Sequence, residues 1–136
     1  MERLFPQEVD LRALSPLTLA FVGDGVYELM AREALVCRAN RPNGDLHRLS
    51  DALVRAEAQS AAMDLLLPLL SEEELAVFKR GRNAHTARAG GDYHRATGLE
   101  ALFGYLYLSG NIARCRELFS VAYGGGRTED GGKKGR

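Results

Sequence analysis

Two acidic residues in otherwise apolar stretches are the strongest chemical signal in the sequence. Asp24 lies in LTLAFVGDGVYELMARE, where a helix turning about 100° per residue surrounds it with apolar side chains. Burial of an isolated carboxylate is costly unless it gains a cation, hydrogen bonds or a raised pKa. Gly23 and Gly25 flank it, and each mid-helix glycine costs about 1 kcal/mol relative to alanine. We therefore expect another backbone or a ligand to approach closely here.

Glu100 repeats this pattern in a second apolar stretch, with Gly104 one turn later. If the two helices cross at their glycines, Asp24 and Glu100 face each other, and two like charges at short range cannot both ionise without a cation. Mg²⁺ takes oxygen ligands of this kind and commonly keeps water and substrate phosphate in its shell. Such a site could activate water for in-line attack on a phosphodiester. Alternatively, each acid faces solvent or pairs with a basic residue. Glu28, one turn after Asp24, is either a further metal ligand or a residue at the edge of the buried helix face.

Helical periodicity and capping signals predict the elements that must position these acids. Ser15 followed by Pro16 starts a first helix, and Ser71 with Glu74 forms a capping box. No alternating run of β-branched residues predicts a strand, so the expected fold class is all-α. Residues 1–123 are expected to form one domain, and the glycine-rich tail at 124–136 to be disordered. The expected helices cover residues 16–37, 45–67, a short stretch after Ser71, 93–109, and a last stretch from Asn111 to about Tyr123.

Composition excludes several classes of protein. The chain of 136 residues is 46% hydrophobic, and 18 basic residues balance 18 acidic ones, so no overall charge attracts it to nucleic acid or membrane. Its longest apolar runs, such as residues 65–70, are far shorter than the ~18 residues of a membrane-spanning helix, and residues 1–10 lack the pattern of a signal peptide. We expect a cytoplasmic protein in which Cys37 and Cys115 are reduced, partly packed thiols.

Three stretches carry a resemblance to a known family: LAFVGDGVYE, FKRGRNA and YHRATGLEALFGYLYL, in this order. Over about residues 14–123 the chain resembles the catalytic domain of ribonuclease III, and most of all the short bacterial branch called Mini-ribonuclease III. The resemblance implies an all-helical endonuclease domain that dimerises through the helix around Asp24. It also implies Mg²⁺-dependent cleavage of double-stranded RNA, leaving 5′-phosphate and 3′-hydroxyl ends. Asp24 matches the signature aspartate of the family and Glu100 its later glutamate, so both are expected to be catalytic and to bind the metal.

The chain departs from the family pattern at three positions. Ribonuclease III proper carries acids where Leu17, Ala20 and Thr97 stand here, so the expected metal site is poorer in carboxylates. The number of ions is therefore open, as is the group that replaces the missing ligands. The longer enzymes also continue into a double-stranded RNA-binding domain, so this catalytic dimer is expected to hold its substrate unaided.

The basic segment KRGRNAHTARAGGDYHR (79–95) is expected to perform that binding. It holds five Lys or Arg and two His against one Asp. These side chains could reach phosphates and 2′-hydroxyls across the wide, shallow minor groove of A-form RNA. The alternative is an ordinary solvated loop. The predicted RNA-binding residues are Lys79, Arg80, Arg82, Asn83, His85, Arg88 and Arg95.

The residues and the resemblance together predict a Mg²⁺-dependent endoribonuclease of double-stranded RNA, in which Mn²⁺ could substitute. The resemblance implies a homodimer that matures the 23S ribosomal RNA precursor of the large subunit, with a ribosomal protein as a helper and no membrane partner. The alternative is a non-catalytic helical RNA-binding or ribosome-associated module whose site has lost its carboxylates. A third hypothesis is a helical protein-interaction domain that does not bind RNA.

Overall fold

The computed structural model describes residues 3–84 and 90–134, with side chains as far as residue 124. Over these residues the chain forms α-helices and short 3-10 helices and no strand, which confirms the predicted all-α class. None of these helices is long and apolar enough to span a membrane. In chain order the elements are η1 (Leu11–Ala13), α1 (Pro16–Arg38), α2 (Asn43–Val54), α3 (Ala56–Leu66), η2 (Leu67–Leu69), α4 (Glu72–Arg82), α5 (Gly91–Leu108) and α6 (Ile112–Lys134).

Local capping bonds begin two of these helices as predicted. The side chain of Ser15 accepts a hydrogen bond from the backbone N–H of Thr18 at the start of α1. At the start of α4, Ser71 accepts from the N–H of Glu74, and the Glu74 carboxylate accepts from the N–H of Ser71. Each cap satisfies backbone donors that a helix start leaves without a partner, which explains why these helices begin where they do.

The structure differs from the expected helix boundaries at two places. The helix expected over residues 45–67 is divided at Arg55, whose extended backbone, with ψ 159°, separates α2 from α3. This division lets α2 pack against α1 while α3 packs against α5 and α6. α6 continues to Lys134, past the expected end near Tyr123. The separate, disordered tail expected at 124–136 stays a prediction.

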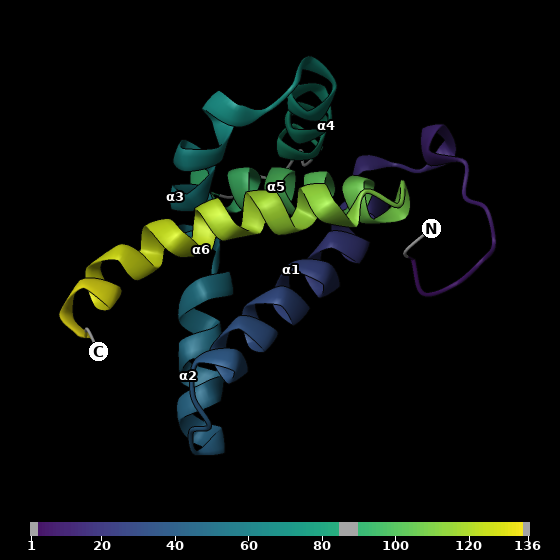
Figure 1. Ribbon diagram of the computed structural model, residues 1–136. Helices are drawn as coiled ribbons and strands as arrows, with labels where there is room; N and C mark the ends of the chain where they lie inside the picture. The colour runs from purple at the N-terminus through teal and green to yellow at the C-terminus, as the bar shows by residue number, and fades with distance from the viewer. Residues whose placement is uncertain (1–2, 85–89, 135–136) are drawn as a thin grey trace.

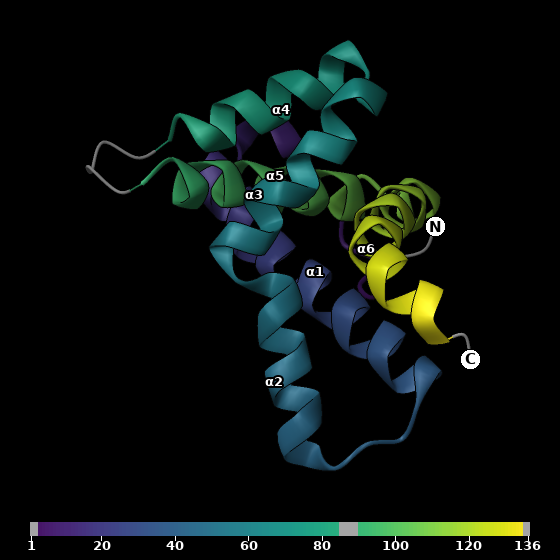
Figure 2. The same cartoon turned by 90° about the vertical axis from the view of Figure 1, so that its left-hand side faces the viewer.

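α5 is the central helix of the domain. It contacts α1, α3, α4 and α6, and in Figure 2 it lies between α4 above and α1 below (Figures 1 and 2). Apart from Glu100, every residue from Ala96 to Gly104 is buried. Phe78 of α4 and Leu118 of α6 are fully buried in the same core. A helix covered on most of its circumference is apolar nearly all round, so a partly buried acid on it requires a specific explanation.

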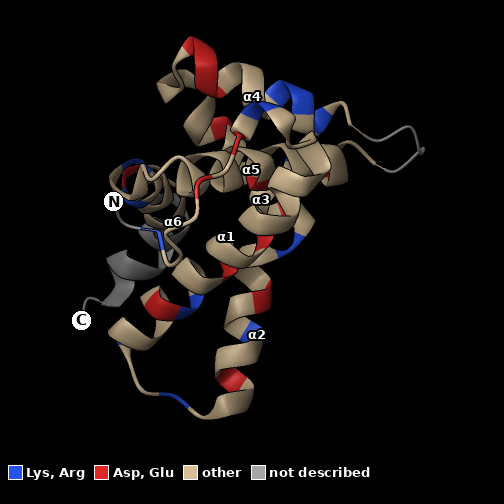
Figure 3. Cartoon of the chain, turned by 90° about the vertical axis from the view of Figure 1, so that its right-hand side faces the viewer, with Lys and Arg blue, Asp and Glu red and all other residues tan. Residues whose placement is uncertain are grey.

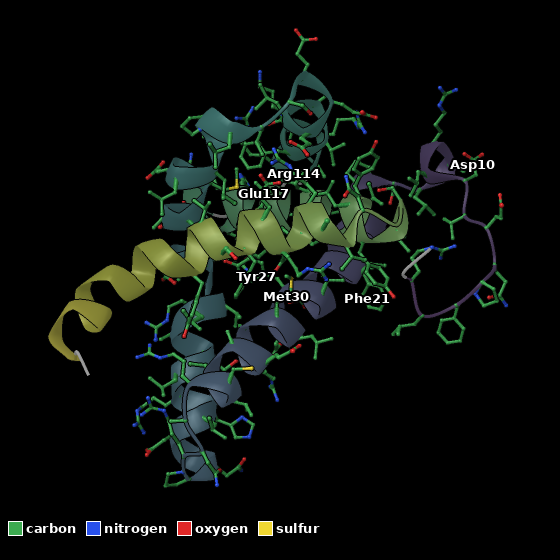
Figure 4. All side chains as sticks on the ribbon, in the orientation of Figure 1. Asp10, Phe21, Tyr27, Met30, Arg114 and Glu117 are labelled. Carbon is green, nitrogen blue, oxygen red and sulfur yellow. The ribbon has the colours of Figure 1, made fainter. Side chains whose placement is uncertain are left out.

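An ion pair with little exposure ties α6 to α4. Arg114 donates two hydrogen bonds of 2.8 Å to the carboxylate of Glu74 and another of 2.8 Å to the carbonyl oxygen of Leu69. Hydrogen bonding from Arg114 holds the pKa of Glu74 below its usual value. Asn111 caps the same end of α6, as predicted, by accepting from the N–H of Arg114. These contacts tie the start of α6 to α4, and Figure 4 labels Arg114 on α6.

Candidate active site

α1 and α5 cross with their backbones in direct contact. A Cβ atom added to Gly23 would lie 1.6 Å from the carbonyl oxygen of Glu100, and one added to Gly104 would lie 1.9 Å from that of Leu19. No side chain fits at either position, so the crossing expected at these glycines is confirmed. Gly25 differs, because an added Cβ would meet nothing within 4 Å among the described residues. The close approach expected at Gly25 is therefore not made within this part of the chain.

The crossing brings Asp24 and Glu100 together. Burial raises the pKa of Glu100, and the charge of Asp24 and a hydrogen bond to Asp24 raise it further, from 4.5 to about 7. The hydrogen bond has this effect because only a protonated Glu100 can donate it to the Asp24 carboxylate. Two acids from distant parts of the chain thus form a pair that resists double ionisation near neutral pH.

Asp24 itself is exposed, which corrects the expectation of a buried carboxylate at this position. Phe21, one of the apolar residues expected to cover it, is 81% exposed. The reason is that the buried stripe of α1 turns toward α5 and the core, and Asp24 lies at the edge of this stripe. The carboxylate therefore meets Glu100 and remains accessible to a ligand. The buried residues of α1 are Leu19, Ala20, Gly23, Tyr27, Ala31 and Leu35.

Gln59 of α3 also belongs to this site, although the sequence analysis did not single it out. Its side chain is 1% exposed, and its carboxamide lies close enough to Glu100 to lower the pKa of that acid, against the larger effects that raise it. The buried positions that follow on the same helix include Ala62, Met63 and Leu66. A lone amide on such a helix face is the signal that could have identified it.

The site has few carboxylates, as the sequence predicts. The positions where ribonuclease III proper carries further acids hold Leu17, Ala20 and Thr97, and the hydroxyl of Thr97 donates to the carbonyl oxygen of Tyr93 in its own helix. Within residues 3–84 and 90–124, no three His, Cys, Asp or Glu side chains group together as a metal site would require. The described part of this chain therefore supplies no third carboxylate to a cation at this position.

Glu28 belongs to the edge of its helix. Its carboxylate pairs with Arg32 at 2.7 Å on the exposed side of α1, one turn after Asp24. The anionic oxygens at the site thus come from Asp24 and Glu100. A pair of carboxylates that repel each other, one of them accessible, fits a hard divalent cation that keeps several water ligands.

The last turn of α4 is basic (Figure 3). Lys79 and Arg80 are exposed, and Arg82 places its guanidinium carbon 5.6 Å from the centroid of the Phe78 ring. Asn83 is also exposed and accepts a hydrogen bond of 3.2 Å from Arg82. Positive side chains at a helix C-terminus are favoured by the helix dipole, so this charge also has a structural reason.

This basic turn packs against α5 close to the acid pair. A Cβ atom added to Gly81 would lie 2.7 Å from the Cβ of Ala101 and 3.0 Å from the Cα of Gly98. Ala101 directly follows Glu100, about 100° further round the helix, and faces α4. The last turn of α4 and the acid pair therefore flank the same short stretch of α5.

Arg95, another predicted RNA-binding residue, is engaged within the chain. Its guanidinium donates to the hydroxyl of Ser60 at 2.9 Å, to the carbonyl oxygen of Ser60 at 2.8 Å and to Asp64 at 2.7 Å. These bonds join α5 to α3, and a contact between Arg95 and RNA stays a prediction. His85 and Arg88 lie outside the described residues.

α1 also carries an exposed apolar stripe. Phe21, Gly25 and Leu29 follow at four-residue intervals and lie on one face, with Phe21 81% and Leu29 62% exposed. An apolar groove of about 500 Å³ lies beside this face, between α1 and α6, and Val26 and Met30 line part of it. Figure 4 marks Phe21 and Met30 on α1. A contiguous exposed apolar surface of this kind indicates an interface with another molecule.

The fold is that of a nuclease family. Residues 17–111, which are most of the chain, match the family model for the Ribonuclease III domain. The chain belongs to this family and is an endoribonuclease.

The curated relatives that the chain resembles are Mini-ribonuclease 3 proteins of bacteria. The chain is similar to Mini-ribonuclease 3 of Thermoanaerobacter sp., 42% identical over 115 residues that cover 81% of each chain. It is also similar to Mini-ribonuclease 3 of Symbiobacterium thermophilum, 46% identical over 114 residues, or 80% of this chain and 88% of the relative. A crystal structure of a protein from Fusobacterium nucleatum matches with a TM-score of 0.77 and 29% identity, over 88% of this chain and 98% of that one.

Proposed function

We propose that the chain is a Mg²⁺-dependent endoribonuclease that cleaves double-stranded RNA as a homodimer in the cytoplasm. The observation that carries this proposal is the approach of Asp24 and Glu100 where α1 crosses α5. The 23S ribosomal RNA precursor is the proposed substrate, with a ribosomal protein as a helper. These two partners rest on the resemblance of the sequence.

Asp24 and Glu100 would hold the cation, and Mn²⁺ could replace Mg²⁺. A bound ion of this kind lowers the pKa of water and neutralises the charge that develops on a scissile phosphate. Because Asp24 is exposed, a duplex can approach the pair without any opening of the fold. Glu100 lies deeper, and its contact with the α1 backbone keeps the two carboxylates in a fixed relation. The expected products carry 5′-phosphate and 3′-hydroxyl ends.

The basic end of α4 would bind the duplex. Lys79, Arg80, Arg82 and Asn83 offer charged and polar donors beside the stretch of α5 that carries Glu100. Contacts with phosphates and 2′-hydroxyls bind A-form RNA by shape and not by base sequence. His85, Arg88 and Arg95 complete the proposed RNA-binding set.

The exposed stripe of α1 supports the homodimer. A side chain would fit at Gly25 among the described residues of its own chain. Glycine nevertheless stands there, although it stabilises a helix by about 1 kcal/mol less than alanine does. A second copy of α1 packed across Gly25, between Phe21 and Leu29, would account for the glycine and cover the two large apolar side chains. The chain's membership of the ribonuclease III family, in which dimers are typical, agrees with this arrangement.

Cleavage of a duplex RNA precursor, measured with and without Mg²⁺, tests the proposal. Wild type is compared with Asp24→Asn and Glu100→Gln, and Glu28→Gln is the matched control because Glu28 pairs with Arg32 outside the site. We expect wild type and the control to cut only with the ion, while the two site variants bind RNA without cutting it. Equal cleavage by Asp24→Asn would contradict the proposal. Binding without cleavage by wild type, in both Mg²⁺ and Mn²⁺, would support the non-catalytic RNA-binding module instead.

A further inference from the structure

The carboxamide of Gln59 has no explanation in the fold. Gln59 is 1% exposed, and neither its Oε1 nor its Nε2 makes a hydrogen bond of ordinary geometry with the described part of the chain. A buried polar group without a partner has lost its hydration and gained no hydrogen bond in return, which carries a desolvation penalty. Methionine has a similar length and would fill the same space without this penalty. The amide is therefore expected to have a purpose other than packing.

Contacts on the neighbouring residue fix the position of this amide. Arg95 of α5 donates to both the hydroxyl and the carbonyl oxygen of Ser60, which directly follows Gln59. These bonds fix α3 against α5 slightly more than one turn before Glu100. The Gln59 carboxamide is thus held beside the Glu100 carboxyl group.

We infer that Gln59 is a positioning residue for Glu100: its Nε2 group donates to one carboxylate oxygen and leaves the other oxygen for a divalent cation. This inference rests on the metal site proposed above. Carboxylates that bind metals are commonly oriented by a hydrogen bond from a second residue. Asp24 cannot orient an ionised Glu100 in this way, because two carboxylates repel each other.

The position of the amide agrees with this role. It lies near the Glu100 carboxyl group without an aligned bond among the described residues. A Glu100 oxygen turned toward Nε2 would supply the acceptor that the buried amide lacks.

Gln59→Met in the full chain separates this role from a structural one. Three quantities are measured: the free energy of urea unfolding without divalent ions, the Mn²⁺ affinity by electron paramagnetic resonance, and kcat and KM for duplex RNA. We expect unfolding to be unchanged or to require more urea, because a buried amide without a partner is removed. We expect the Mn²⁺ affinity to fall about 10- to 100-fold, as for other residues that orient metal ligands. kcat should fall while KM for RNA is retained.

Ser50→Ala is the matched control. The Ser50 hydroxyl is also buried without a partner among the described residues, but it lies on α2 and lines a cavity with Leu35 and Leu46. Its removal should leave the Mn²⁺ affinity unchanged. If Gln59→Met does not fold, Gln59→Asn serves in its place, since its amide is one methylene shorter and is therefore withdrawn from Glu100; this variant should also weaken Mn²⁺ binding.

The outcomes distinguish this inference from the function on which it rests. A folded Gln59→Met or Gln59→Asn protein that binds Mn²⁺ as tightly as wild type overturns the role of Gln59 and leaves the proposed function intact. A wild type that does not bind Mn²⁺, or an Asp24→Asn variant that binds it equally well, contradicts the proposed metal site itself.

Discussion

Gly23 of α1 lies against the main-chain carbonyl of Glu100 on α5, at a separation that leaves no room for a side chain. Asp24 directly follows Gly23, so this one backbone contact determines how the two acids meet. The candidate site is therefore built by the packing of two helix backbones. A substitution that touches neither carboxylate can be expected to alter it.

Gly23→Ala tests that dependence. The new methyl group would lie 1.6 Å from a main-chain oxygen, which cannot rotate away as a flexible side chain can. We expect the free energy of unfolding to fall by about 3 kcal/mol or more, at the upper end of overpacking effects. Gly44→Ala is the control, because its Cβ meets nothing within 4 Å, and its effect should be within about 0.5 kcal/mol. Urea titration measures both, and a fully stable Gly23→Ala protein would show that the helices do not cross as described.

The raised pKa of Glu100 predicts that stability depends on pH in the absence of divalent ions. Between the ordinary value of 4.5 and the folded value of about 7, the folded state holds a proton that the unfolded state has lost. The contribution of Glu100 to stability is therefore present at low pH and is lost as the pH rises through this window. Glu100→Gln removes this dependence, so wild type should lose stability relative to the variant on going from about pH 5 to about pH 8.

Urea unfolding of both proteins at the two pH values measures this difference. Added Mg²⁺ should stabilise wild type at the higher pH and have little effect on Glu100→Gln, because the ion relieves the repulsion between the carboxylates. A stability difference between the two proteins that stays constant with pH would be inconsistent with a protonated Glu100.

Charge at the end of α4 predicts the salt dependence of RNA binding. Joint replacement of Lys79 and Arg80 by serine removes two exposed positive charges. The plot of log affinity against log salt concentration should become shallower by about 1.8, using the figure of about 0.9 per phosphate contact for duplex DNA as a guide. Arg48→Ser removes an exposed arginine on α2 that pairs with Asp45, and it should leave the slope unchanged. Equal slopes for wild type, the double variant and Arg48→Ser would show that RNA does not bind at the end of α4.

The apolar stripe of α1 predicts the oligomeric state. Phe21→Glu places a charge where the homodimer would bury an aromatic ring, so the variant should be monomeric at concentrations at which wild type is dimeric. Val36→Glu changes another exposed apolar residue, 59% exposed near the far end of the same helix, and should remain dimeric. Sedimentation velocity distinguishes the two states. A dimeric Phe21→Glu protein would exclude this face as the interface.

The sequence predicts those features that depend on neighbouring residues or on a strict steric requirement. The caps at Ser15 and Ser71 involve groups three residues apart, and the crossing at Gly23 and Gly104 follows from two glycines in otherwise apolar helices. The break at Arg55 was not predicted, because the apolar spacing continues through it while the tertiary packing of α2 and α3 differs.

Burial within a helix was harder to predict than the helix itself. The apolar residues around Asp24 indicate burial on every side, yet the stripe that includes Phe21 is exposed in the single chain. Gln59 was missed because one amide has no periodicity of its own, and only the packing of α3 on α5 places it beside Glu100. The sequence likewise assigns Arg95 to a basic RNA-binding segment, because its hydrogen bonds to Ser60 and Asp64 of α3 depend on tertiary packing.

Asp24 and Glu100 are proposed to hold one divalent cation together, and anomalous scattering from crystals grown with Mn²⁺ would locate that ion. We expect an anomalous peak at the acid pair of each chain, with oxygen atoms of both carboxylates at about 2.1 Å, close to the distance at which Mg²⁺ binds oxygen. A peak that only one of the two acids contacts, or no peak at this position in crystals of a protein that cleaves RNA with Mn²⁺, would contradict it.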